Sequence, residues 1–176
     1  QLLMESVGLE VASYDSAQDY LDHFSPDQHG CLILDVRMRG MSGLELQSRL
    51  QQFPSHPPIV MISAHGDVPM AVRALQAGAL DFLEKPFNAQ ALLDSVHRAM
   101  QQDALRRGEA SRLAEIKERI ARLTPREAEV MLRVVDGQRN KVIASEMGIT
   151  QSTVEAHRAR VMEKMAARTL SELMRM

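Results

Sequence analysis

The sequence has few of the features that mark secreted, membrane-spanning or metal-binding proteins. Its 176 residues include one cysteine and no tryptophan, and a lone cysteine cannot form a disulfide within its own chain. No apolar run approaches the roughly 20 residues of a membrane span, and no signal peptide is recognisable. The six histidines show no metal-ligand spacing. We therefore expect a cytoplasmic protein without a membrane partner, in which Cys31 is a small buried side chain.

The charged residues are distributed unevenly along the chain. Residues 1–103 carry 6 basic and 13 acidic side chains, whereas residues 104–176 carry 15 basic and 10 acidic ones. An acidic half thus precedes a basic half. The basic half is the part suited to a nucleic-acid partner, although a solvated charged helix explains some of the excess.

The first half alternates short apolar runs with amphipathic segments, which predicts a doubly wound, parallel α/β sheet. The predicted strands are 9–14, 31–35, 58–62 and 80–83, and the predicted helices are 16–24, 43–52, 68–77 and 89–101. Residues 1–7 resemble the end of an uncapped amphipathic helix, so the N-terminus looks incomplete.

Chemically compatible side chains follow three successive strands. Asp35 ends the run 31–35, Ser63 follows 58–62, and Lys85 with Pro86 follows 80–83. A single aspartate at a strand end is usually a turn former or a helix cap. Because open α/β sheets gather their functional groups at the carboxyl edge, the three together predict a phosphoryl-acceptor site.

The second half predicts helices only. Residues 101–122 form a charged linker helix, and Thr124, Pro125 and Glu127 form a capping box that opens the next segment. Short helices at about 125–135 and 140–147, a third capped by Thr150 or Ser152, and a fourth from about Thr169 imply a helix-turn-helix. We therefore expect domains at 1–100 and 123–176, joined by the linker 101–122.

The third of these helices has one apolar and one polar face. Val154, Val161 and Met165 define the buried stripe, and Met131, Met147 and Met162 are expected to fill the same core. The opposite face would enter the DNA major groove, although any surface helix has a polar face. The predicted base-reading residues are Glu155, Ala156, Ala159 and Arg160, and the predicted phosphate contacts are Arg139, Lys141, Lys164 and Arg168.

Both halves resemble known families. The first resembles the flavodoxin-like receiver domain of two-component response regulators. That resemblance implies that Asp35 accepts a phosphoryl group, that Ser63, Phe82 and Lys85 sense it, and that the Lys85–Pro86 peptide is cis. It also implies Mg2+ held by Asp35 and the backbone carbonyl of Arg37. The second half resembles the LuxR-type DNA-binding domain in the runs 123–130, 140–144 and 153–158, and the combination is similar to FixJ-type regulators.

The resemblance also has departures. The family's first strand, which carries two acidic magnesium ligands, is missing before residue 9 and would lie between 9–14 and 31–35. Met38-Arg39 stands where the family has Met-Pro. His65, next to Ser63, is expected to be a solvated loop histidine.

The resemblance implies a transcriptional regulator that a sensor histidine kinase phosphorylates, that dimerises when phosphorylated and that binds double-stranded DNA. RNA polymerase stays open as a further partner. Two alternatives are a phosphorylation-independent regulator with a degenerate receiver and a phosphatase that forms an aspartyl-phosphate. The phosphatase is disfavoured because such enzymes use a second aspartate two residues after the first, where this chain has Arg37.

Overall fold

The computed structural model describes residues 2–64 and 66–176. His65 and Gln1 lie outside the described residues, and with them the prediction for the His65 side chain. The chain divides into two compact units, residues 1–107 and 108–176. Each unit has its own hydrophobic core.

The first unit is built on a parallel sheet of three strands. They are β1 (Leu32–Asp35), β2 (Ile59–Ser63) and β3 (Asp81–Glu84), in the order β1-β2-β3. The register pairs Asp35 with Ile62 and Ser63 with Glu84. The three strands therefore end at the same edge of the sheet, which confirms the predicted parallel arrangement.

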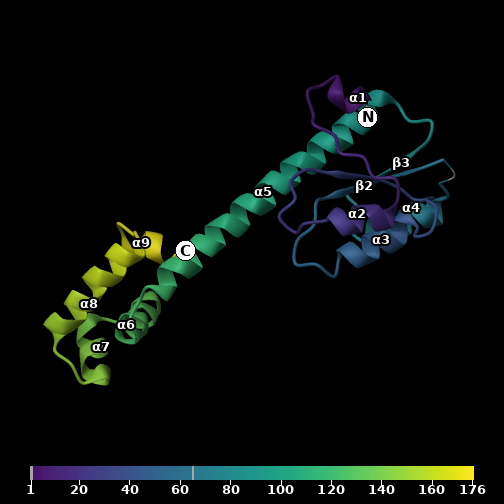
Figure 1. Ribbon diagram of the computed structural model, residues 1–176. Helices are drawn as coiled ribbons and strands as arrows, with labels where there is room; N and C mark the ends of the chain where they lie inside the picture. The colour runs from purple at the N-terminus through teal and green to yellow at the C-terminus, as the bar shows by residue number, and fades with distance from the viewer. Residues whose placement is uncertain (1, 65) are drawn as a thin grey trace. The chain divides into compact units, whose positions relative to one another are not determined.

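Helices cover both faces of this sheet (Figure 1). On one face lie α2 (Ala17–His23), α3 (Gly43–Leu50) and α4 (Val68–Gln76). On the other lie α1 (Leu2–Glu5) and the first part of α5 (Ala89–Ala121). Alternate residues of β2 point to opposite faces, so fully buried Met61 joins the first core and fully buried Val60 the second. The sheet is doubly wound, as predicted.

The predicted strand 9–14 is wrong. This segment belongs to no strand, and it borders a cavity of about 850 Å3. Leu9, Val11 and Tyr14 line the cavity together with Leu32 and Leu34 of β1. An extended segment becomes a strand only when its backbone pairs with a neighbour, and among the described residues this segment shows no backbone hydrogen bond to β1.

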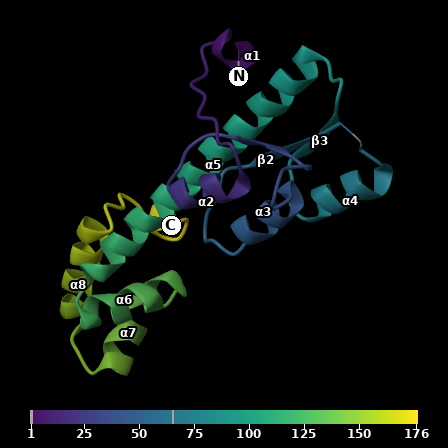
Figure 2. The same cartoon turned by 45° about the vertical axis from the view of Figure 1, so that its right-hand side comes forward.

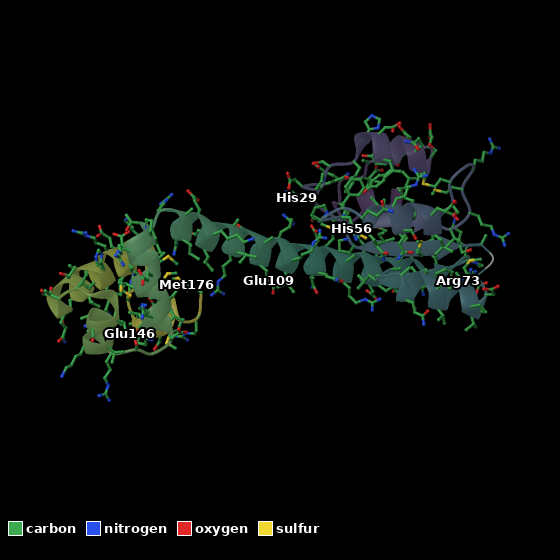
Figure 3. All side chains as sticks on the ribbon, turned by 90° about the horizontal axis from the view of Figure 1, so that it is seen from below. His29, His56, Arg73, Glu109, Glu146 and Met176 are labelled. Atoms are coloured by element: carbon green, nitrogen blue, oxygen red, sulfur yellow. The ribbon has the colours of Figure 1, made fainter. Side chains whose placement is uncertain are left out.

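Helix α5 is a single helix of 33 residues where two separate segments, 89–101 and 101–122, were predicted. No proline interrupts it, and Gly108 is its only glycine. Figure 3 shows Glu109 on its charged stretch. Within the described residues, no helix combines the length and the apolar character that a membrane span requires.

The first unit holds α5 through Asp103, whose side chain is 1% exposed. Its carboxylate accepts hydrogen bonds from the Gly30 N–H at 3.1 Å and from the guanidinium groups of Arg106 and Arg107, both at 2.8 Å. Arg106 also donates to the carbonyl of His56, which Figure 3 labels. The helix is therefore tied to the loops that precede β1 and β2.

The second unit is entirely helical. After the end of α5 come α6 (Pro125–Val135), α7 (Asn140–Met147), α8 (Gln151–Lys164) and α9 (Leu170–Leu173) (Figure 2). Thr124 caps α6 in a capping box, and Thr150 caps α8. Gly148 ends α7 at φ 65°, a left-handed conformation that glycine adopts without steric cost.

The core of this second unit contains the predicted apolar stripe of α8. Val154, Val161 and Met165 are buried there. Met131, Met147 and Met162 pack against the same core, so the predicted role of these methionines is confirmed.

Candidate functional site

The structure brings Asp35, Ser63 and Lys85 together at the carboxyl edge of the sheet. The Lys85 ammonium lies 2.8 Å from Asp35 Oδ2, and the Arg37 N–H donates to Asp35 Oδ1 at 2.9 Å. The Asp35 side chain is 31% exposed, whereas Ser63 is fully buried. An accessible carboxylate with a paired lysine suits a group that receives a phosphoryl group and stabilises its added charge.

The backbone fixes the position of Lys85. Its N–H donates to the Ser63 carbonyl at 2.7 Å, which continues the pairing of β2 and β3 by one residue. The Lys85–Pro86 peptide is cis, as predicted. The lysine therefore leaves the sheet at a defined point beside the acceptor strand.

Phe82 is partly buried and packs against the core between the sheet and α4. Its ring lies against Gly66. A Cβ atom at position 66 would come within 2.7 Å of Phe82 Cε1. The absence of a side chain at Gly66 thus permits this position of the ring, a requirement that our sequence reasoning missed.

The predicted magnesium ligands do not form a complete site. The chain offers the Asp35 carboxylate and the nearby backbone of Arg37, and the described residues contain no cluster of three histidine, cysteine, aspartate or glutamate side chains that could hold a metal. Mg2+ takes six oxygen ligands in near-octahedral geometry, and water and substrate phosphates usually supply several of them. Asp35 and the Arg37 carbonyl would supply only one carboxylate and one carbonyl oxygen, which is a weak fit, and we derive no step through the ion.

Helix α8 presents a polar face to solvent in the second unit. All four predicted base-reading residues, Glu155, Ala156, Ala159 and Arg160, are exposed. The buried Val154 and Val161 hold the opposite side of the helix against α6 and α7. Within the second unit, the helix-turn-helix therefore leaves this side of α8 uncovered.

The predicted phosphate contacts differ in their surroundings. Arg139, Lys141 and Arg168 are exposed, and within the described residues their side chains form no ion pair. Lys164 is only partly exposed, and its ammonium lies 2.6 Å from Glu127 Oε2. Lys164 and the Thr124 N–H lower the pKa of Glu127 to about 2.

A second polar contact joins the two helices of the helix-turn-helix. Arg158 of α8 donates to Asn140 Oδ1 at 2.8 Å, and the Asn140 amide reaches Glu155 at 3.5 Å. Our sequence reasoning assigned Glu155 to DNA and gave Asn140 and Arg158 no role. Asn140 lies in the run 140–144 and Arg158 in the run 153–158, both of which resemble the LuxR-type domain. That resemblance was the signal that could have identified the two residues.

Cys31 is partly buried and free, and it belongs to the core on the α5 face of the sheet. Burial, together with the nearby Asp103 carboxylate, raises the pKa of the thiol to about 12. A thiol that stays protonated is a poor nucleophile.

The chain matches two protein families in succession. Residues 1–97 match the response regulator receiver domain, and residues 121–176 match the LuxR family of bacterial regulatory proteins. Nodulation protein W of Bradyrhizobium diazoefficiens is 47% identical over 174 residues, which cover 99% of this chain and 77% of that protein. The transcriptional regulatory protein FixJ of Azorhizobium caulinodans is 44% identical, over 99% of this chain and 82% of that protein.

Solved structures agree with this result. The response regulator StyR is 45% identical and superposes with a TM-score of 0.90, covering 99% of this chain and 88% of that one. Proteins of this kind regulate transcription and are not enzymes, so the phosphatase alternative is discarded. The chain belongs to the FixJ type of response regulators, in which a receiver domain precedes a LuxR-type DNA-binding domain.

Proposed function

We propose that this protein is a transcription regulator that a sensor histidine kinase activates by phosphorylating Asp35. The observation that carries the proposal is the pair of Asp35 and Lys85, 2.8 Å apart at the sheet edge beside buried Ser63. In the transfer, an Asp35 oxygen attacks the phosphorus of a phosphohistidine and the phosphorus–nitrogen bond breaks. The histidine nitrogen keeps the bonding electrons, and an acyl phosphate forms on Asp35.

The acyl phosphate would change the contacts around Asp35. Its oxygens compete for the Lys85 ammonium and for the Ser63 hydroxyl, and a shift of Ser63 opens space toward Phe82. We infer that the ring of Phe82 then turns inward and repacks the face formed by α4, β3 and α5. A local change of charge thereby selects one of two packings of that face.

The α4 helix supports dimerisation through this face. Val68, Val72 and Leu75 are 76%, 42% and 45% exposed. Their spacing of four and three residues places them on one side of the helix. Exposed apolar residues gathered in this way mark an interaction surface, and we assign it to a second copy of the chain.

The second unit would bind DNA through α8. Glu155, Ala156, Ala159 and Arg160 lie on its exposed face, where a major groove could receive them. Arg139, Lys141 and Arg168 form no ion pair within the part of the chain that the structure describes, and they could contact phosphates on either side. A dimer would then place two such helices on half-sites about one helical turn apart.

Acetyl phosphate tests the acceptor assignment. Incubation of the chain with acetyl phosphate and Mg2+, followed by intact-mass measurement, should show a small fraction carrying one phosphoryl group. The fraction should be small because one carboxylate and one carbonyl hold Mg2+ weakly. Asp35→Asn should remove the adduct, and Asp27→Asn, at an exposed loop position, should leave it unchanged.

Two outcomes would contradict the proposal. An adduct that persists in Asp35→Asn would place the phosphoryl group elsewhere. An unsubstituted chain that never acquires a phosphoryl group would favour the phosphorylation-independent regulator.

A further inference from the structure

Three hydrogen bonds tie the C-terminal end of α8 to its neighbours. Lys164 Nζ donates to Glu127 Oε2 at 2.6 Å and to the Arg122 carbonyl at 3.1 Å. Arg119 Nη1 donates to the carbonyl of Met165, the residue that caps α8, at 2.8 Å. We call these contacts the α8 clasp. They join the last turn of α8 to the end of α5 and to the beginning of α6.

The clasp uses the ammonium group that a phosphate contact would need. Glu127 is 2% exposed, and its carboxylate also accepts the Thr124 N–H at 2.8 Å. If Lys164 turned toward a DNA phosphate, Glu127 would keep a buried charge without its cation. Breaking a buried ion pair by removing one partner is strongly unfavourable.

The helical geometry agrees with this reading. Taking 100° per residue, Lys164 lies about 80° from the centre of the buried stripe formed by Val154, Val161 and Met165, whereas Arg160 lies about 120° from it. The Lys164 side chain therefore starts at the flank of the helix next to α6. Its 33% exposure fits this intermediate place.

We propose that Lys164 is a positioning residue, which acts through Glu127 and Arg122 to fix α8 for sequence-specific DNA binding and does not itself contact phosphate. The proposal rests on the assignment of α8 as the DNA-reading helix. Arg160 is one helical turn before Lys164, so a clasp at the end of α8 holds the register of its base-reading side chains. Loss of the clasp should reduce discrimination between sequences more than general affinity.

The test uses the full 176-residue chain and two DNA duplexes. One is selected from a random pool by the unsubstituted chain, and the other has the same composition in scrambled order. We expect Lys164→Met and Glu127→Gln each to weaken binding to the selected duplex by about tenfold, the scale of one lost base contact, with little change on the scrambled one. The slope of log affinity against log salt concentration should stay unchanged.

The effect of Glu127→Gln on DNA affinity distinguishes a positioning role of Lys164 from a phosphate contact, because the two roles predict changes in opposite directions. Glutamine still accepts the Thr124 N–H but loses the ion pair. If Lys164 contacted phosphate, Glu127→Gln would release its ammonium and binding would become tighter or stay the same. Lys164→Met would then weaken binding to both duplexes alike and make the salt slope shallower by about one. Either result would overturn the proposal.

Two further variants exclude a purely structural effect. Thr124→Ala removes the hydroxyl that caps Glu127 N–H and leaves the ion pair, so it should lower the thermal midpoint and retain sequence discrimination. Equal loss of discrimination in Thr124→Ala would refute the positioning role. Lys164→Arg keeps a cation within reach of Glu127 and should restore discrimination.

Failure of the underlying function is recognised separately. Circular dichroism would show whether Glu127→Gln folds. If it does not, the salt slopes and the sequence discrimination of Lys164→Met and Lys164→Arg are sufficient to distinguish the positioning role from a phosphate contact. If neither the unsubstituted chain nor its second unit alone, residues 108–176 with their own hydrophobic core, selects a duplex from the pool, DNA reading by α8 is refuted before any variant is made, and the positioning role with it.

Discussion

Gly43, the first residue of α3, lies directly against the end of β1. A Cβ atom there would lie 2.3 Å from the Asp35 carbonyl oxygen, and the Gly43 N–H donates to the Val36 carbonyl at 3.0 Å. The obstacle is backbone, which cannot turn away as a side chain can. Only glycine therefore lets α3 begin directly behind Asp35.

We predict that Gly43→Ala lowers the free energy of unfolding by about 1–3 kcal/mol, the usual cost of overpacking. Urea denaturation followed by circular dichroism would measure it. Gly108→Ala is the control and should raise the free energy of unfolding. A Cβ atom at Gly108 meets nothing within 4 Å, and alanine is more stable than glycine in a helix interior by about 0.5–1 kcal/mol. Unchanged stability in Gly43→Ala would show that α3 can shift away from β1.

At the scale of elements, the helix-turn-helix predicts two kinds of DNA contact. Lys141 is exposed near the start of α7, and Arg160 is exposed on α8. Lys141→Ala should weaken binding to every sequence alike and make the salt slope shallower by about one. Arg160→Ala should cost about 1–3 kcal/mol and relax preference at one base position.

Binding of both variants to selected and scrambled duplexes at several salt concentrations would measure these effects. Gln151→Ala, at an exposed position at the start of α8, is the control, because it tests whether any substitution on this surface changes DNA affinity or the salt slope. Identical behaviour of Lys141→Ala and Arg160→Ala would place α8 outside the groove.

The capping box of α6 makes the stability of the second unit depend on pH. The pKa of Glu127 is lowered from its ordinary value near 4.5 to about 2, first by Lys164 and then by the Thr124 N–H. A carboxyl group whose pKa falls on folding stabilises the folded state above its unfolded pKa. This stabilisation should be complete above about pH 4.5 and should disappear as the pH falls toward about 2.

Thermal unfolding of the unsubstituted chain and of Glu127→Gln would test this dependence. The difference between their thermal unfolding midpoints should be constant near neutral pH and should decrease on acidification below about pH 4.5. Glu163→Gln, on the exposed face of α8, serves as the control. A difference that stays constant down to about pH 3 would contradict the role assigned to the Glu127 carboxylate.

At the scale of the whole molecule, the proposed activation requires that phosphorylation favours a dimer. Moving a population from about 1% to about 99% active needs roughly 5.5 kcal/mol of differential stabilisation. The exposed stripe of Val68, Val72 and Leu75 is where we expect a second copy to bind. The fraction of dimer should therefore rise with the fraction of chains phosphorylated at Asp35.

Sedimentation velocity and intact mass, measured on the same samples, would test this relation. Val72→Lys should abolish dimerisation without changing phosphorylation, because it places a charge in the apolar stripe. Gln102→Lys, exposed on α5, should dimerise normally. A dimer fraction independent of the phosphorylated fraction would refute dimerisation as the activation step.

Much of this protein is determined by local sequence alone. The apolar runs that became β1, β2 and β3, the caps Ser16 and Thr124, and the left-handed Gly148 are local signals, whereas the choice of Thr150 over Ser152 as the cap of α8 came from the structure. Their effects act within a few residues, so sequence spacing is sufficient to predict them. The convergence of Asp35, Ser63 and Lys85 also followed from sequence, because parallel strands end at one edge.

Contacts between distant segments depended on the tertiary structure. Residues 9–14 have a strand-like pattern but lack a neighbour to pair with, and pairing is not local. Asp103 lies in a charged stretch that predicts solvent exposure, yet Gly30 and two arginines surround it. The sequence predicted Lys164 as a phosphate contact, whereas in the structure Glu127 of α6 lies beside it and forms an ion pair with it. Burial and pairing depend on which elements meet, and this is what only the folded chain decides.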